Sequence, residues 1–148
     1  GLTLAQCVQR GNGVPLGHAD SLKNMLYRSF GASSFAKFWQ YWNPIWGYGL
    51  GKYVHIPLRR FLPAELALVL TFVVSGGIHD LVVMALRQSF VFLLTPWFFL
   101  LGLGVLLGKA MKMDLSKYSW LARAVVNLAY ILLCLMLAVM IRNALGFQ

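Results

Sequence analysis

The chain has 148 residues, of which 59% are hydrophobic and only 11% are charged, and its mean hydropathy is +0.70. A soluble globular domain carries about a quarter charged residues, so too few polar side chains are present here to cover a surface in water. The net charge of +9 comes from 13 basic and 4 acidic residues, but the basic residues lie at the ends of apolar runs. This arrangement is typical of membrane anchoring, so the composition predicts an integral membrane protein and excludes a nucleic-acid partner.

Residues 1–32 are expected to form a loop followed by one amphipathic helix. Consecutive turn formers after position 10 predict that residues 1–19 are a loop. Asp20 or Ser21 can cap a helix that ends at Gly31. The apolar side chains of this helix share one face, as expected for a helix that lies along a membrane surface. They are Leu22, Met25, Leu26 and Phe30.

Residues 33–63 are expected to lie at the membrane interface. A second helix begins at Ser33 or Ser34 and ends near Asn43, because Pro44 disfavours helical geometry in the residue before it. Trp and Tyr favour the headgroup level of a bilayer, where the ring and its polar edge are both accommodated. The segment is rich in these residues: Trp39, Tyr41, Trp42, Trp46, Tyr48 and Tyr53.

Three membrane spans follow, over about residues 64–86, 90–108 and 124–141. Each is close to the 20 or so residues that a helix needs to cross a bilayer core. Pro96 interrupts the second span and predicts a kink there. The interfacial segment and the spans together form one membrane domain over residues 33–148. The predicted fold is therefore all-α, with three transmembrane helices preceded by amphipathic helices.

Basic residues flank these spans unequally, which predicts their orientation. The connection between the first and second spans carries only Arg87, and only Arg142 follows the third span. The remaining flanks are strongly basic, with Lys37, Lys52, Arg59 and Arg60 before the first span and Lys109, Lys112, Lys117 and Arg123 after the second. By the positive-inside rule, the N-terminal region and the 109–123 loop of this multi-pass protein are cytoplasmic.

Two glycine pairs have the spacing that allows close helix packing. They are Gly104 with Gly108 in the second span and Gly47 with Gly51 in the interfacial segment. Small residues are also common in membrane helices without any such contact, so both interpretations remain open at this stage.

The first span carries an unusual polar stripe. A charge at membrane depth costs at least about 2.5–3.5 kcal/mol on insertion scales, so ionisable residues there usually face a protein interior or a wet cavity. Thr71, Ser75 and His79 are four residues apart and share one helix face, whereas Asp80 is turned about 100° from His79. His79 can serve as a general base, because the imidazole pKa lies near working pH, or it can simply bond a neighbouring helix.

Three motifs occur in a fixed order along this region. The first is Phe38-Trp39-Gln40-Tyr41-Trp42-Asn43, the second combines Tyr53 with Pro57-Leu58, and the third is Ser75-Gly76-Gly77-Ile78-His79. In their order and separation they resemble the membrane-bound O-acyltransferase (MBOAT) family, which shows an F-W-x-x-W-N/H element, a Y-x-x-x-P-L-like stretch and an S-G-x-x-H element. Members of that family move an acyl chain from a thioester such as acyl-CoA onto an alcohol.

The resemblance implies a role for each matching residue. His79 is expected to be the catalytic base and Asn43 its partner, which positions the acceptor or polarises the thioester. Ser75, Trp42 and Trp39 are expected to support the site. Neither a cofactor nor a metal ion is expected, and an acyl-CoA-like thioester is the co-substrate. The residues expected to bind this donor are Lys52, Arg59 and Arg60, which could equally bind anionic lipid headgroups.

The expected partners are membrane lipids, the acyl thioester and a hydroxyl-bearing lipid, glycan or small acceptor. Three spans can hardly enclose a reaction chamber, so a homo-oligomer or a partner subunit is also expected. A covalent route through a Ser75–His79 pair is a less favoured mechanism. The alternative function is a non-catalytic structural or partner-binding membrane protein. A third possibility is a small transporter with His79 and Asp80 in a proton path.

Overall fold

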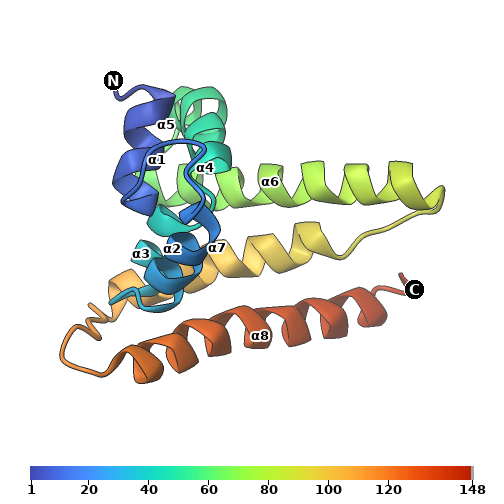
Figure 1. Cartoon of the computed structure of the whole chain (residues 1–148). Helices are drawn as coiled ribbons and strands as arrows, with labels where there is room; N and C mark the ends of the chain where they lie inside the picture. Colours follow the sequence, from blue (N-terminus) through green and yellow to red (C-terminus); the bar gives the residue numbers. More distant parts are fainter. Residues whose placement is uncertain (148) are drawn as a thin grey trace.

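The computed structural model describes residues 1–147, and these residues contain helices and no strand. Three long helices lie side by side, with α7 (Leu94–Ala110) between α6 (Ala64–Arg87) and α8 (Trp120–Ala144). The shorter helices gather at the end where α6 and α8 begin and α7 ends (Figure 1). The expected all-helical fold is therefore confirmed.

The three apolar runs of the sequence correspond to these long helices. The run at 64–86 matches α6 within one residue, α8 is longer than the expected 124–141, and α7 starts four residues later than expected. By length and composition, α6 and α8 can each cross a membrane, whereas α7 has only 17 residues. Most of the side chains on α6 and α8 are not buried within the chain, with 28% and 17% of their most apolar windows buried.

The expected kink at Pro96 is wrong. Pro96 is the third residue of α7, which is one continuous helix from Leu94 onward. The first N–H groups of a helix have no partner within it, so a proline there removes no hydrogen bond. Residues 90–93, which were expected to belong to this span, instead form part of the connection from α6.

The expected loop over residues 1–19 is also wrong, because α1 (Leu4–Asn12) lies within it. Thr3 and Gln6 form a capping box, each side chain accepting a hydrogen bond from the other residue's backbone N–H. Gly13 ends the helix with a left-handed φ of 74°. The turn formers after position 10 thus mark the end of a helix rather than the middle of a loop.

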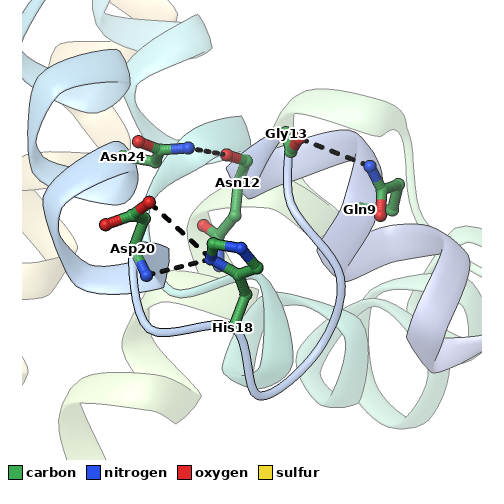
Figure 2. Close-up of polar contacts among 6 residues, drawn as sticks. All are labelled: Gln9, Asn12, Gly13, His18, Asp20 and Asn24. Atoms are coloured by element: carbon green, nitrogen blue, oxygen red, sulfur yellow. Dashed lines mark hydrogen bonds and ion pairs between the residues drawn. The ribbon is translucent and has the colours of Figure 1, made fainter.

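The connection from α1 to α2 (Ser21–Phe30) is held by polar contacts (Figure 2). Asn24 donates its side-chain N–H to the carbonyl of Asn12 over 3.1 Å. The expected side-chain cap by Asp20 or Ser21 is wrong: Asp20 occupies the N-cap position without a side-chain bond to the helix, and its backbone N–H donates to Nδ1 of His18. As expected, the helix ends before Gly31.

The interfacial segment forms α3 (Phe35–Tyr41) and then a nearly unbroken helical run. As expected, Ser34 caps α3, whose last residue lies just before Trp42. The run that follows consists of α4 (Pro44–Leu50), a π-helical turn η1 (Gly51–His55) and α5 (Ile56–Arg59). The wide π turn precedes Pro57, whose ring would clash with a carbonyl in a regular α-helix.

Aromatic packing against α7 and α8 anchors the short helices to the long ones. The buried core combines the α3 side chains Phe35 and Phe38 with Leu101 and Val105 of α7. Buried Asn127 of α8 donates its amide N–H groups to two backbone carbonyls at the α2–α3 junction. These bonds compensate for burying the amide N–H groups, whereas the buried side-chain oxygen has no hydrogen-bond partner among the described residues.

The two glycine pairs turn out differently. A Cβ at Gly104 would lie 3.2 Å from the Tyr130 ring, so this glycine admits an aromatic side chain of α8. No atom lies within 4 Å of such a Cβ at Gly47 or Gly51, so among the described residues this pair makes no close packing contact. A close approach between the long helices occurs at Gly76, where a Cβ would lie 2.7 Å from the carbonyl oxygen of Leu94.

Candidate functional site around His79

His79 lies where α4, α6 and α7 meet. Trp46 of α4 approaches its ring edge-to-face with the ring centroids 5.4 Å apart, and Phe98 of α7 lies 5.2 Å away. The imidazole is half-buried. Two aromatic walls therefore restrict how the ring can turn and shield part of it from solvent.

A backbone contact defines the hydrogen-bonding state of the His79 ring. Nδ1 lies 2.6 Å from the carbonyl oxygen of Ser75, one helical turn earlier. A carbonyl can only accept a hydrogen bond, so Nδ1 must carry the proton and donate it. In the neutral ring this places the free lone pair on Nε2. The fold thus presents His79 as an imidazole whose second nitrogen can accept a proton.

The hydroxyl of Ser75 has a different partner. Its Oγ accepts a hydrogen bond from the indole N–H of Trp46 over 2.9 Å, and the residue is only 4% exposed. No hydrogen bond joins this hydroxyl to His79 within residues 1–147. The geometry therefore does not supply the nucleophile–base contact that the less favoured covalent route needs. The hydroxyl hydrogen of Ser75 remains available for donation.

Asn43 is not hydrogen-bonded to His79 in the part of the chain that the structure describes. Its side-chain oxygen accepts from the backbone N–H of Trp46, which caps α4. Its own backbone is left-handed, with φ 41°, a conformation that asparagine tolerates better than most residues. Asn43 thus sets the start of the helix that carries Trp46 to the His79 ring.

The other two supporting residues lie in the aromatic core. Trp39 contacts Phe72 of α6 edge-to-face, and Trp42 stacks on Phe38 with the ring centroids 5.6 Å apart. The indole N–H of Trp39 is buried without a hydrogen-bond partner among the described residues. Trp39 therefore packs α3 against α6, whereas the ring contacts of Trp42 lie within the short helices α2 and α3.

Asp80 has a role that the sequence analysis did not identify. Its carboxylate is 2% exposed and accepts hydrogen bonds from the N-terminal end of α7. The donors are the backbone N–H groups of Leu93, Leu94 and Thr95 and the hydroxyl of Thr95, at 3.4, 3.0, 2.8 and 2.7 Å. A negative charge is favourable at this end of a helix dipole. Leu93 occupies the N-cap position of α7, and its apolar side chain cannot accept hydrogen bonds from the first N–H groups of the helix. An apolar residue at this position is the sequence signal that another side chain must supply the acceptor.

The expected donor-binding residues lie on η1, α5 and the residue that follows. Lys52 lies over the rings of Tyr48 and Tyr53, and these two tyrosines, Tyr48 first, raise the pKa of Lys52. Arg59 donates to the carbonyl of Leu62, and Arg60 is exposed. Nothing within residues 1–147 ties these side chains to His79 by a hydrogen bond or an ion pair.

The same surface holds a histidine with a perturbed pKa. The pKa of His55 is lowered from 6.5, first by burial and then by repulsion from Arg59 and Lys109. Lys109 belongs to the last turn of α7, so cations from two parts of the chain act together here. A neutral imidazole thus lies within a basic surface.

Comparison of the chain with protein-family models, curated proteins and solved structures gives no match. The described residues contain no group of three or more His, Cys, Asp or Glu side chains that could hold a metal ion.

Proposed function

We propose that this chain is a membrane-embedded O-acyltransferase of the MBOAT type in which His79 is the general base. The observation that carries the proposal is the contact between His79 Nδ1 and the Ser75 carbonyl, because it leaves the Nε2 lone pair free. A base that must take a proton from an alcohol needs such a lone pair in a fixed orientation.

The proposed reaction joins an acceptor alcohol to a thioester carbonyl. As the alcohol oxygen forms its bond to the carbonyl carbon, Nε2 of His79 takes the hydroxyl proton. The tetrahedral intermediate then loses its C–S bond, and the imidazolium returns the proton to the departing thiolate. The Ser75 hydroxyl, whose oxygen is already held by Trp46, is the proposed donor to the oxyanion.

We further propose that α6, α7 and α8 all cross a membrane. The length and apolar composition of α6 and α8 support this, and so does the exposure of most of their side chains. Buried core helices of a soluble protein would instead be covered by the chain. The proposed orientation places the N-terminal helices and the 109–123 loop on the cytoplasmic side, following the distribution of basic residues.

A partner is part of the proposal. On α6, Ile78, Leu81 and Val82 lie next to His79 in the sequence and are exposed. One chain therefore leaves the flank of the site open, and a second copy or another membrane subunit would have to close it around an acyl chain.

An acyl-transfer assay tests the proposal. Protein with any co-purifying partner would be placed in nanodiscs with labelled acyl-CoA and hydroxyl-bearing lipids or glycans. We expect His79→Gln to transfer at least about 100-fold more slowly than the unchanged protein, since general-base catalysis contributes about 10²–10⁴-fold. The control His18→Gln removes an exposed histidine from the connection between α1 and α2 and should transfer normally. Equal rates for His79→Gln and the unchanged protein would refute the proposed base.

A structural membrane protein is the second candidate. It is favoured by the bonding of Asn43 and Asp80, whose side chains hold helix N-termini rather than meeting His79. This candidate predicts no transfer by the unchanged protein and identical partner assembly by His79→Gln. The four hydrogen bonds on the Asp80 carboxylate also argue against the transporter, because they commit this side chain to holding the start of α7.

A further inference from the structure

A small basic pocket lies away from His79, where α2, α3 and the start of α8 meet. Its volume is about 280 Å³, and no carboxylate lines it. Its basic side chains are Arg28, Lys37 and Arg123, one from each of these three helices. Stacked Tyr27 and Trp120 form part of its wall. We refer to this site as the basic pocket.

The cations of the basic pocket lack an acidic partner. Within residues 1–147 the one ion pair joins His18 and Asp20, so no carboxylate lies within 4.0 Å of these three side chains. The Nε atom of Arg123 is buried and has no hydrogen-bond partner in the described chain. A buried donor without an acceptor costs free energy, and here it belongs to a cation that no carboxylate of the described chain neutralises.

Two neighbouring groups partly satisfy these cations. The guanidinium of Arg28 lies 4.7 Å from the centre of the Tyr41 ring, which also lines the pocket. The pKa of Asp114 is lowered, first by hydrogen bonds from Ser116 and to a smaller extent by Lys37. Asp114 is fully exposed, so solvent screens its attraction for Lys37. The positive charge of the pocket therefore remains largely uncompensated.

The wall of the basic pocket is fixed in place. Trp120 donates its indole N–H to the carbonyl of Tyr27 over 2.9 Å, and their rings stack at 5.4 Å. A Cβ at Gly31 would lie 2.4 Å from the Trp120 ring, so only glycine admits the indole there. The cavity is thus preformed, which lowers the entropic cost of binding a ligand.

We propose that the basic pocket binds a phosphate group. Planar guanidinium groups match phosphate oxygens with paired N–H donors, and Lys37 adds a flexible point charge. The phosphate could belong to the headgroup of an anionic phospholipid or to a soluble phosphate ester, because the recognition chemistry is the same. The proposal does not depend on acyl transfer, since the pocket shares no residue with the His79 site.

Calorimetric titration of the full chain in detergent tests this site. One arm would use short-chain phosphatidylglycerol, and the other would use inorganic phosphate. We expect Arg123→Gln and Lys37→Gln each to weaken binding roughly tenfold, in line with a lost charge-assisted hydrogen bond. The matched control is Lys23→Gln, which removes an exposed positive charge from α2 outside the pocket and should bind as the unchanged protein does.

The two arms distinguish the sources of phosphate. Pocket-dependent binding of the lipid alone assigns the site to a headgroup, and pocket-dependent binding of both ligands assigns it to phosphate in general. Equal weakening by Lys23→Gln would show unspecific charge attraction and overturn the proposal, as would unchanged binding by both pocket variants. If Arg123→Gln fails to fold, exposed Lys37 still provides the test.

Discussion

At the scale of single residues, the two ionisable side chains of α6 have separate tasks. His79 bonds a carbonyl of its own helix, whereas Asp80 bonds the start of α7. Neighbouring residues of a helix are separated by about 100° around its axis, so the side chains of His79 and Asp80 face different surroundings. Asp80 bonds the N-terminal end of α7, and Phe98 lies on the same helix. Asp80 therefore helps to position Phe98, which forms one wall of the His79 site.

Asp80→Ala should destabilise the protein by about 2 kcal/mol, because it leaves buried N–H groups at the start of α7 without an acceptor. Thermal unfolding in detergent would measure the loss. The matched control is Asp20→Ala, since Asp20 occupies the N-cap position of α2 without a side-chain bond to it. Similar small effects from both substitutions would show that the Asp80 bonds contribute little.

His55 should make stability depend on pH. Its folded pKa lies below the ordinary 6.5, so in the range between these values the unfolded state binds more protons than the folded state. Stability should therefore fall as the pH is lowered through that range. His55→Gln should flatten the fall in a series of melting temperatures, and Lys109→Gln should do so in part. Parallel pH curves for His55→Gln and the unchanged protein would contradict this.

Sequence reasoning identified the important residues of the site better than their contacts. His79 and Asp80 stand out because charge is costly in an apolar run. Their partners are mostly backbone groups, a carbonyl for His79 and N–H groups for Asp80, and these do not appear in a residue pattern. The family resemblance implied that Asn43 lies beside His79. Its side chain instead caps α4 by accepting from a backbone N–H, another contact that a residue pattern does not show.

At the scale of helices, α6 and α7 approach each other more closely at Gly76 than at Gly102, the other glycine packed at this contact. A Cβ at Gly76 would approach the backbone of Leu94 and Thr95 to 2.7 and 2.9 Å. At Gly77 the nearest atom would be the Thr95 hydroxyl oxygen at 4.0 Å. Adjacent glycines thus have different environments: a Cβ would press against a backbone at Gly76 but make only an ordinary van der Waals contact at Gly77.

Gly76→Ala should therefore cost about 1–3 kcal/mol, because α7 must move away from α6 to admit the methyl group. Gly77→Ala should be neutral or stabilising by up to about 1 kcal/mol, since alanine favours a helix and the space is free. Unfolding in detergent would compare the pair. Equal losses from the two variants would contradict the close approach at Gly76.

The long helices could be predicted because each is a long, mostly apolar run. The short ones were harder, because their limits depend on caps. The Thr3–Gln6 capping box was overlooked beside the stronger turn formers that follow it, and α1 was assigned to a loop. Pro96 was expected to kink the helix because the residue pattern does not show that α7 begins only at Leu94. The start of α7 is stabilised by its hydrogen bonds to Asp80, and Pro96 therefore lies in the first turn.

At the scale of the whole molecule, the short helices gather at one end of the three long ones, and the C-terminus lies at the other end (Figure 1). The basic pocket and the basic surface around His55 belong to the end with the short helices. The proposed orientation places this end at the cytoplasmic face, in contact with lipid headgroups.

Thiol labelling would test this orientation. Cys7 lies on α1, and an introduced Ser89→Cys would lie in the exposed connection between α6 and α7. A membrane-impermeant maleimide added outside intact cells should label the residue at 89 and leave Cys7 unlabelled, while inverted vesicles should show the reverse. Buried Cys134 should react in neither case. Labelling of both positions from the same side would contradict the three-span arrangement.

The central claim is that His79 is held as a base with its lone pair on Nε2. Nitrogen-15 NMR of the protein in bilayers, in alkaline buffer, measures this most directly, with His79→Gln used to assign the signal. We predict that Nδ1 carries the proton, as its bond to the Ser75 carbonyl requires, and that Nε2 gives the shift of an unprotonated nitrogen. A proton on Nε2 and none on Nδ1 would contradict the claim.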